Sequence, residues 1–273
     1  MTEASAKNKR RKLESALKEL GSVVIAFSGG VDSAFLTKVA ADTLSSNGGR
    51  ALAVTAKSGS LPKRELDEAI ELARLIGIKH RVIESDEMSV EGYVSNPPDR
   101  CYHCKSELFG KLTAIANDEG FNAVLDGANA DDMAGHRPGS KAADEMKVRS
   151  LLREAGLTKK EIRVLSRGLG LPTWDKPAFA CLASRFPYGE AITDDKLAMV
   201  ERSEQILAEQ GFTQFRVRYH GDVARIELNQ AEISKAVKPE VAEQINTAFT
   251  RIGFKYVAVD IIGYRTGSMN EGL

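Results

Sequence analysis

The sequence predicts an α/β fold, in which an open parallel sheet carries helices on both faces, followed by a small C-terminal α+β domain. Short apolar runs alternate with amphipathic runs of helical period in the first part of the chain. Further on, two strand-like runs flank a tight turn, which is typical of a hairpin. A chain of 273 residues is long enough for two cores. We therefore expect one domain over residues 1–190 and another over 191–273.

Four apolar runs are the expected strands of the parallel sheet. They lie at residues 23–27, 51–55, 81–83 and 123–125. Amphipathic runs alternate with them at residues 13–20, 34–40, 65–73 and 101–117, and two more end near residue 172. Strands joined by helices pair in parallel, and the connecting helices cover both faces. The carboxyl ends of the strands then share one edge, where ligands bind.

The most informative stretch is the turn Ser-Gly-Gly-Val-Asp-Ser at residues 28–33, between the first expected strand and the helix that follows. Gly29 and Gly30 permit backbone conformations that a Cβ would block, so several N–H groups can converge on one anion. The dipole of the following helix adds partial positive charge at the same point. An ordinary strand-to-helix connection is the alternative, but this motif in this position predicts a phosphate-binding loop.

The remaining side chains of the turn suit a nucleotide. Ser28 and Ser33 can donate hydroxyl hydrogen bonds, and Asp32 makes sense beside a phosphate if it holds Mg²⁺. The chain contains no Gly-x-x-x-x-Gly-Lys-Ser/Thr sequence, so this is not a Walker A loop. The turn resembles the PP-loop of the ATP pyrophosphatase superfamily, whose fold is adenine nucleotide α-hydrolase-like. That resemblance implies adenylation of a substrate oxygen by ATP, with release of pyrophosphate.

An acidic loop follows the fourth expected strand. It covers residues 126–132 and contains three carboxylates. Because it begins at the carboxyl end of a parallel strand, we expect it to face the same crevice as the phosphate loop. Asp126 and Gly127 are therefore candidate ATP-binding residues, with carboxylates as natural partners for Mg²⁺ and ribose. A solvated turn is the alternative, since Asp, Gly and Asn are common turn residues.

Residues 173–192 form a long stretch that reads as neither helix nor strand. Long irregular loops in compact domains are usually functional, so we expect this one at the floor or lid of the site. Lys176 and Arg185 are candidate clamps for the α-phosphate or for a substrate carboxylate. Either could instead be a solvated surface charge.

The three cysteines, Cys101, Cys104 and Cys181, allow three interpretations. They could be small buried hydrophobic residues. Two of them could bind zinc together with a histidine, from His80, His103, His136 or His220. All three could ligate a 4Fe-4S cluster and leave one iron open. A neighbouring adenylating loop favours the cluster, because sulfide held on the open iron can displace AMP.

In the expected second domain, strands at residues 215–219 and 223–228 flank His-Gly-Asp, with helices at 194–210 and 242–252 and a last strand at 256–262. Arg216 and Arg218 share one face of the first strand. They either point together at an anion or a partner acid, or form a surface charge ladder with Glu227 across the hairpin.

Composition limits the classes of partner and compartment. Lysine plus arginine (38) balance aspartate plus glutamate (38), which argues against a dedicated nucleic-acid binder. Residues 1–12 have no apolar segment of a secretory signal, and no run is long enough to cross a bilayer. We expect a cytoplasmic protein, in which an odd number of cysteines is a poor disulfide framework.

The assembled chain resembles the LarE family of ATP-dependent sulfur transferases, a branch of the PP-loop superfamily, over residues 13–270. The resemblance rests on the stretches 28–33, 125–132, 136–139, 174–177, 181–189 and 216–220. The Ser-Arg-Phe-Pro-Tyr-Gly string from Ser184 and the paired arginines are the most specific. In this family each carboxylate of pyridinium-3,5-biscarboxylate mononucleotide is adenylated and converted to a thiocarboxylate, for the nickel-pincer nucleotide.

The resemblance also implies roles for single residues. One subgroup gives up the sulfur of one loop cysteine, whereas another has three cysteines and a 4Fe-4S cluster. Cys101, Cys104 and Cys181 match the second subgroup, so we expect them to take part in catalysis as cluster ligands. By the same resemblance Ser184, Arg185, Arg216 and Arg218 become substrate-binding candidates beside Lys176, with Glu204 and Glu227 in the matching C-terminal region. Family members form hexamers, which implies a homo-oligomer.

Three other functions compete with this interpretation. A PP-loop tRNA thiolase also combines a Cys-x-x-Cys pair with a distant cysteine, but usually adds zinc-binding pairs or basic RNA-binding segments, which this sequence lacks. An ammonia-using amide synthetase would not need the cysteines. A nucleotide sensor without catalysis would release no pyrophosphate. The sulfide source is not encoded in any recognisable motif.

Overall fold

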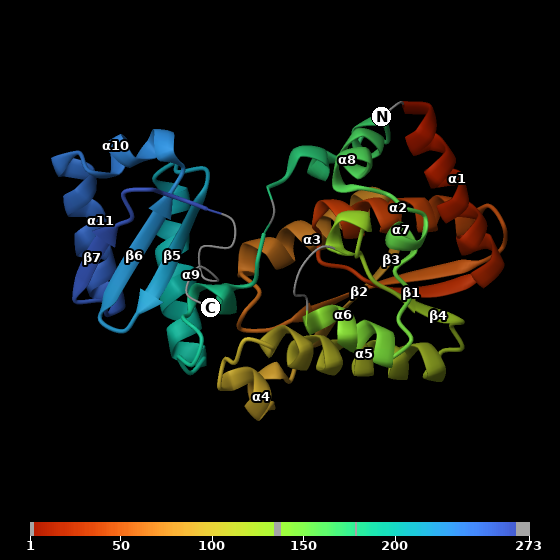
Figure 1. Cartoon of the computed structure of the whole chain (residues 1–273), viewed down its shortest axis with the longest axis horizontal. Coiled ribbons are helices and arrows are strands. Elements are labelled where there is room, and N and C mark those ends of the chain that lie inside the picture. The colour runs from red at the N-terminus through yellow and green to blue at the C-terminus, as the bar shows by residue number, and fades with distance from the viewer. Residues whose placement is uncertain (1–2, 134–137, 178, 266–273) are drawn as a thin grey trace. The chain divides into compact units, whose positions relative to one another are not determined.

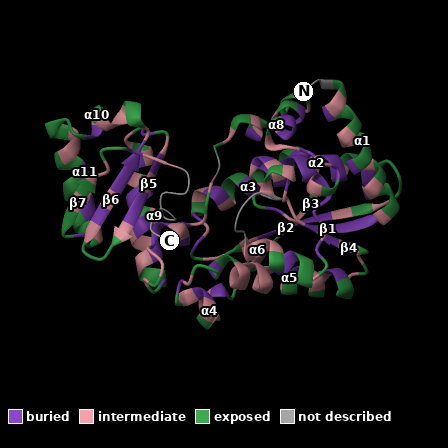
Figure 2. Cartoon of the chain, viewed as in Figure 1, coloured by how far each residue is buried: buried purple, intermediate pink, exposed green. Residues whose placement is uncertain are grey.

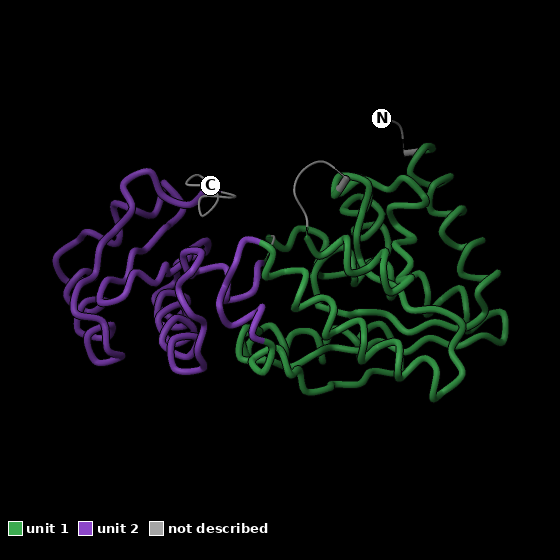
Figure 3. The backbone as a smooth tube through the Cα atoms, turned by 60° about the horizontal axis from the view of Figure 1, so that its bottom comes forward, with its two compact units in different colours: residues 1–90, 99–179 green, residues 91–98, 180–273 purple. Residues whose placement is uncertain are grey.

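The computed structural model describes residues 3–133, 138–177 and 179–265. The possible zinc ligand His136 lies outside these residues. The chain divides into two compact units, one of residues 1–90 and 99–179 and the other of residues 91–98 and 180–273 (Figure 3). The division at residue 179, earlier than the expected residue 190, has a physical cause. The Asn96 side chain donates to the carbonyl oxygens of Pro187 (2.7 Å) and Glu190 (3.1 Å), which attaches residues 180–190 to the second unit.

The first unit contains the expected parallel sheet. Its strands are β1 (Ser22–Ala26), β2 (Arg50–Lys57), β3 (Lys79–Glu84) and β4 (Ala123–Leu125). They lie in the order β3-β2-β1-β4, and all pairs are parallel. β1 is therefore central, between β2 and β4. Ile25 of β1 is in register with Leu125 of β4, so these two strands end side by side.

Helices cover both faces of this sheet (Figure 1). One face carries α1 (Glu3–Leu20), α2 (Val31–Ser45), α3 (Lys63–Ile76), α7 (Leu151–Glu154) and α8 (Lys159–Gly168). The other carries α5 (Arg100–Asp118) and α6 (Pro138–Glu145). Strand residues alternate between the two cores: Val23 and Ile25 pack with the first group, whereas Val24 packs with the second. The central strand β1 is buried along most of its length (Figure 2). The expected α/β fold with an open parallel sheet is confirmed.

The second unit is the expected small α+β domain. Its strands are β5 (Phe215–His220), β6 (Val223–Leu228) and β7 (Tyr256–Val259), in the order β5-β6-β7. Its helices are α4 (Glu91–Val94), α9 (Asp194–Glu209), α10 (Ile233–Ala236) and α11 (Pro239–Ile252). β5 and β6 form the expected antiparallel hairpin, whose tight turn has Gly221 at φ +62°. β7 ends before residue 262 because the Asp260 carboxylate accepts hydrogen bonds from the N–H groups of Ile262 and Gly263, which turns the chain.

Short 3₁₀ helices complete the described structure, at Glu87–Ser89, Ala130–Met133, Pro172–Asp175, Leu182–Arg185 and Gln230–Glu232. Two of them lie in the stretch read as irregular from the sequence. Across the described residues, no helix is both long enough and apolar enough to cross a membrane.

Candidate functional site

The phosphate loop closes on itself through its two serines. The Ser28 and Ser33 hydroxyl oxygens are 3.0 Å apart, and the Ser33 hydroxyl donates to the Gly30 carbonyl oxygen at 3.2 Å. The Ser28 N–H also donates to the Ser33 hydroxyl oxygen, at 3.3 Å. These contacts hold the turn in shape between β1 and α2. The sequence Ser-Gly-Gly-Val-Asp-Ser thus forms a preorganised loop at the N-terminus of a helix of 15 residues.

The two glycines of this loop have different structural roles. Gly29 has φ +69°, and a Cβ at this position would come within 3.0 Å of the Ala69 Cβ atom on α3. Only glycine fits both the backbone conformation and the space. Gly30 is the residue before α2, and its position supplies no side-chain cap. Because Gly30 has no side chain, it offers no side-chain acceptor to the first N–H groups of α2. These N–H groups are therefore suited to bind an anion.

The acidic loop lies directly beside the phosphate loop. A Cβ on Gly127 would come within 3.2 Å of the Ser33 backbone nitrogen, so the two loops approach too closely for any larger residue. Asp126 is fixed in place because its Oδ1 atom accepts hydrogen bonds from the Ala128 N–H (3.2 Å) and the Ser150 hydroxyl (2.7 Å). Asp126 and Gly127 thus lie at the expected edge of the sheet, and ATP binding by them stays a prediction.

Asp32 has a partner that the sequence did not reveal. The Lys159 ammonium group donates to Asp32 Oδ2 at 2.6 Å, although the two residues are 127 positions apart. Burial raises the pKa of the Asp32 carboxyl above its ordinary value, and the hydrogen bond from Lys159 acts in the opposite direction. The other carboxylate oxygen, Oδ1, is buried and has no partner within hydrogen-bond distance among the described residues, although the Asn129 side chain is near enough to the carboxyl to lower its pKa. One oxygen of Asp32 is therefore available to a cation.

Lys176 lies in an ion-pair cluster within the first unit. Its ammonium group donates to Glu65 Oε2 (2.8 Å) and to Glu68 Oε2 (2.6 Å), both on α3. Burial alone would lower the pKa of Lys176, but the two carboxylates outweigh it and raise the pKa. Arg163 fixes the same segment by donating to the carbonyl oxygens of Trp174 and Lys176, each at 2.8 Å. The structure therefore contradicts the interpretation of Lys176 as a solvated surface charge.

The cysteines are divided between the two units. Cys101 and Cys104 lie in the first turn of α5, three residues apart, with Cys101 exposed and Cys104 partly buried. The Cys104 thiol donates to Glu87 Oε2 at 3.2 Å. Cys181 belongs to the second unit and is also partly buried. None of the three is fully buried, so they are not small residues of a core.

The described histidines that could have bound zinc have other neighbours. The ring of His80 forms a hydrogen bond of 2.9 Å with the Thr55 hydroxyl, and His220 accepts one of 3.2 Å from Arg225. His103 Nε2 lies 3.8 Å from an Asp99 carboxylate oxygen. Across the part of the chain that the structure describes, no three His, Cys, Asp or Glu side chains gather as a metal site.

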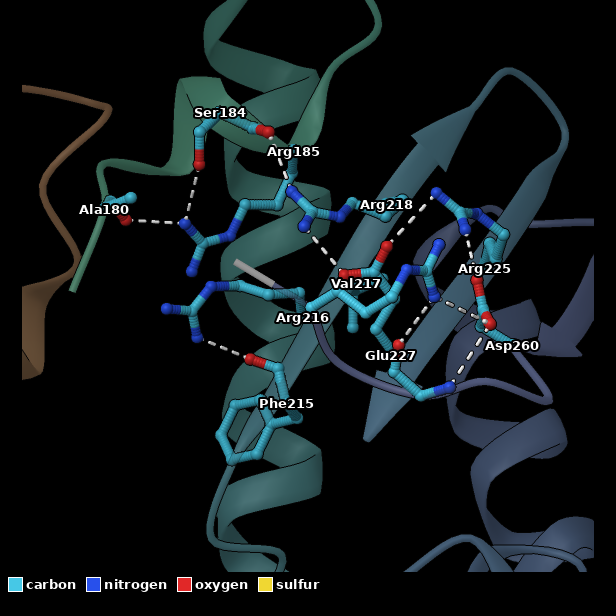
Figure 4. Close-up of polar contacts among 12 residues, drawn as sticks. Ala180, Ser184, Arg185, Phe215, Arg216, Val217, Arg218, Arg225, Glu227 and Asp260 are labelled. Atoms are coloured by element: carbon cyan, nitrogen blue, oxygen red, sulfur yellow. Dashed lines mark hydrogen bonds and ion pairs between the residues drawn. The ribbon is translucent and has the colours of Figure 1, made fainter. Parts of the chain in front are cut away.

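In the second unit Arg185 is completely buried and forms a bidentate ion pair; Figure 4 shows its further contacts with Ala180 and Ser184. Its Nε and Nη2 atoms donate to the two oxygens of Glu204, at 2.8 and 2.9 Å. Its Nη1 atom donates to the Ala180 carbonyl oxygen (2.5 Å) and to the Ser184 hydroxyl (3.0 Å). Glu204 also accepts the Val217 N–H at 3.1 Å. The pair therefore joins the Cys181 loop to α9 and β5.

Arg218 and Arg216 differ although they share a strand face. Arg218 is buried and donates to Glu227 Oε2 at 2.7 Å and to the Ser184 carbonyl oxygen at 2.9 Å (Figure 4). An ion pair with Glu227 across the hairpin is therefore present, but both side chains are buried, so the interpretation as a surface charge ladder is wrong. Arg216 is only partly buried, and its guanidinium lies 5.1 Å from the centre of the Tyr264 ring. Burial lowers the pKa of Arg216, and the positive charge of Arg185 lowers it further.

Arg225 and Asp260 extend this cluster and were not singled out in the sequence. Arg225 donates to Asp260 at 2.5 Å and lies 3.2 Å from Glu227 Oε1. The register of the hairpin could have indicated their role, because it places Arg225 directly opposite Arg218. Two like charges facing each other across strands require acids between them.

Comparison with known proteins decides the family. The chain is 39% identical over 270 residues, covering 99% of this chain and 96% of the relative, to a pyridinium-3,5-bisthiocarboxylic acid mononucleotide synthase of Lactiplantibacillus plantarum. The chain belongs to the LarE family. It is also 46% identical over 255 residues to an uncharacterized protein of Synechocystis, covering 93% of this chain and 94% of that one.

A third relative is more distant. It is an uncharacterized protein of Methanocaldococcus jannaschii, 29% identical over 258 residues, which cover 93% of this chain and 96% of the relative. No protein-family model matches the chain. Membership of the LarE family confirms the resemblance found in the motifs, and the three-cysteine subgroup stays a prediction.

Proposed function

We propose that this LarE-family chain is an ATP-dependent sulfur transferase that converts the carboxylates of pyridinium-3,5-biscarboxylate mononucleotide into thiocarboxylates. One observation carries the proposal: the chain aligns over nearly its whole length with a synthase named for the bisthiocarboxylic acid mononucleotide. The phosphate loop beside the acidic loop supports the use of ATP, because activation of a carboxylate requires a nucleotide with its phosphates held in place. The homo-oligomer and the cytoplasmic location expected for the family stay predictions.

The proposed reaction has two steps for each carboxylate. A carboxylate oxygen attacks the α-phosphorus of ATP, a P–O bond breaks, and pyrophosphate leaves. A hydrosulfide then adds to the acyl carbon, and AMP departs with the electron pair of the C–O bond. The product is a thiocarboxylate, and no net oxidation or reduction occurs. Fixed donors around the phosphates lower the barrier of the first step, because they stabilise charge that develops there.

In the first unit, the phosphate loop would hold the β- and γ-phosphates of ATP. The N–H groups at the start of α2 and the hydroxyls of Ser28 and Ser33 are the donors, with Gly29 and Gly30 leaving room. Asp32 fits a role as a ligand of Mg²⁺, because Mg²⁺ prefers oxygen ligands and Oδ1 accepts no hydrogen bond from the described residues.

We assign Cys101, Cys104 and Cys181 to a 4Fe-4S cluster on the family resemblance and not on their geometry, since no three such side chains gather among the described residues. Cys101 and Cys104 lie three residues apart on one face at the start of α5, and neither is fully buried, so both are accessible as ligands. When bound through three thiolates, such a cluster would offer one open iron to a sulfide. Cys181 as the third ligand follows the family resemblance. The alternative is that Cys181 gives up its own sulfur, and iron analysis distinguishes this alternative from a cluster.

In the second unit, Arg216 is the arginine that we assign to the substrate. Arg185 and Arg218 are buried against Glu204 and Glu227, whereas Arg216 is partly exposed. The charges of Arg185 and Arg218 raise the positive potential at Arg216, which suits a phosphate or carboxylate. Ser184, whose carbonyl oxygen accepts from Arg218, and Lys176 stay predicted substrate-binding residues.

The proposal predicts pyrophosphate release that depends on the substrate. With ATP, Mg²⁺ and pyridinium-3,5-biscarboxylate mononucleotide, the protein should release pyrophosphate, and Asp32→Asn should slow the release by about 100-fold because one metal ligand and one negative charge are lost. Asp42→Asn is the matched control, since Asp42 lies on the same helix, paired with Lys38 on the surface. Release without the substrate, or none with it, would contradict the proposal.

A further inference from the structure

The ion pair between Lys159 and Asp32 has no role in the function described above. It joins the first residue of α8 to the first turn of α2, two helices that lie on the same face of the sheet (Figure 1). Both side chains are partly accessible, with 33% of Lys159 and 20% of Asp32 exposed. The contact therefore lies at the edge of the phosphate loop and is partly exposed, although the Asp32 Oδ1 atom itself is buried.

The pair with Lys159 neutralises Asp32 at this edge, where the carboxylate of Asp132 adds a further negative charge. The N-terminus of α2 carries partial positive charge, and Asp32 adds a full negative charge in its first turn. Lys159 neutralises that charge through one carboxylate oxygen, Oδ2, while Oδ1 accepts no hydrogen bond from the described residues. A divalent cation at Oδ1 would take over the neutralisation of Asp32. The ammonium group of Lys159 would then need another anion.

The backbone of Lys159 is fixed beside the acidic loop. Its N–H donates to Asp131 Oδ2 at 2.8 Å, and Thr158 and Glu161 form a reciprocal capping box around it. Glu161 is in turn held by Lys9 of α1, at 2.8 Å. The backbone at the start of α8 is thus fixed, whereas the Lys159 side chain can still rotate about the bonds of its four methylene groups. The ammonium group can move from a carboxylate to a phosphate without any shift of the helix.

We infer that Lys159 is a phosphate-binding residue of this site, which leaves Asp32 and pairs with the triphosphate when Mg²⁺ and ATP bind. The inference rests on the proposed use of ATP and adds to it a residue and an exchange of partners. In the protein without nucleotide, Lys159 holds the Asp32 side chain in position through its hydrogen bond. In the complex, Asp32 faces the metal ion and Lys159 faces the phosphate oxygens, so each charge has a partner in both states.

Calorimetric titration with α,β-methylene-ATP and Mg²⁺ tests this exchange. Lys159→Met should raise the Kd for the triphosphate by about 10- to 100-fold, the effect of losing a hydrogen bond to a charged group. Binding of adenosine should change by less than about twofold, because adenosine has no phosphate. Lys159→Arg keeps the charge and should recover most of the affinity. Lys160→Met is the matched control, since Lys160 is the exposed next residue of α8.

Each outcome has one meaning. Unchanged triphosphate binding by Lys159→Met would overturn the inference and leave the proposed function intact. Equal losses for triphosphate and adenosine would also overturn it, because they would show a structural effect. If the unchanged protein binds no triphosphate, the proposed use of ATP fails and this inference fails with it. Circular dichroism of the folded variants excludes unfolding as the cause.

Discussion

Replacement of Arg185 by alanine is expected to lower the free energy of unfolding of the second unit by about 3–5 kcal/mol. Arg185 has no exposed surface and donates to both oxygens of Glu204. Alanine would leave the Glu204 carboxylate buried without its cation, and would also remove the donors to the Ala180 and Cys181 carbonyl oxygens. Hydrogen exchange of peptides from α9 and β5, measured over a urea series, reports the stability of this unit in the full chain.

Two variants make the Arg185 result specific to the buried ion pair. Arg251→Ala, on an exposed position of α11, should change stability by less than about 0.5 kcal/mol. The double variant Arg185→Met/Glu204→Leu should be less destabilised than Arg185→Ala, because no charge is left buried alone. An Arg185→Ala protein as stable as the unsubstituted protein would contradict this explanation. So would a double variant that is less stable than the single one.

The second large effect concerns iron. Protein purified without oxygen should be brown and hold about four irons per chain, as a 4Fe-4S cluster requires. Cys101→Ala, Cys104→Ala and Cys181→Ala should each remove nearly all iron, because each deletes one of only three protein thiolates. Ser106→Ala, one turn further along α5, is the control and should retain the iron. Iron and sulfide analysis, with the visible absorption spectrum, gives the readout without any activity assay.

Two results would contradict the cluster. One is a colourless, iron-free protein that is fully active and loses the sulfur of Cys181, which would place the chain in the sacrificial subgroup. The other is one zinc per chain that survives in Cys181→Ala, which would favour the Cys101 and Cys104 pair as a zinc site.

Much of the fold was predictable because its signals are local. The runs of apolar residues marked the parallel strands, and the His-Gly-Asp turn marked the hairpin of β5 and β6. The phosphate loop was also visible, since its glycines and hydroxyls lie within six consecutive residues. An ion pair across the hairpin could be predicted for the same reason, but the register places Glu227 opposite Arg216, whereas the pair that forms is the diagonal one with Arg218.

The partners of the charged site residues were not predictable in the same way. Lys159 reaches Asp32, Lys176 reaches Glu65, and Arg185 reaches Glu204 only after the elements have packed. With 38 basic and 38 acidic residues, the sequence allows very many pairings, and periodicity does not select among them. Burial also decides which charges must pair, and burial is a property of the tertiary structure.

The position of the domain boundary was also hard to predict from the sequence. The sequence places the change of pattern near residue 190, whereas the second unit begins at residue 180 and includes residues 91–98. Asn96 makes this difference through its side-chain hydrogen bonds to Pro187 and Glu190. A contact between segments so far apart in the chain leaves no periodic signal in either one.

Mass spectrometry of the nucleotide product tests the central claim most directly. The protein is incubated without oxygen with ATP, Mg²⁺, hydrosulfide and pyridinium-3,5-biscarboxylate mononucleotide. The account predicts a product in which sulfur replaces one oxygen of each converted carboxylate, with one AMP and one pyrophosphate formed for each sulfur inserted. An unchanged nucleotide, or a carboxamide formed when ammonia is supplied instead, would contradict it.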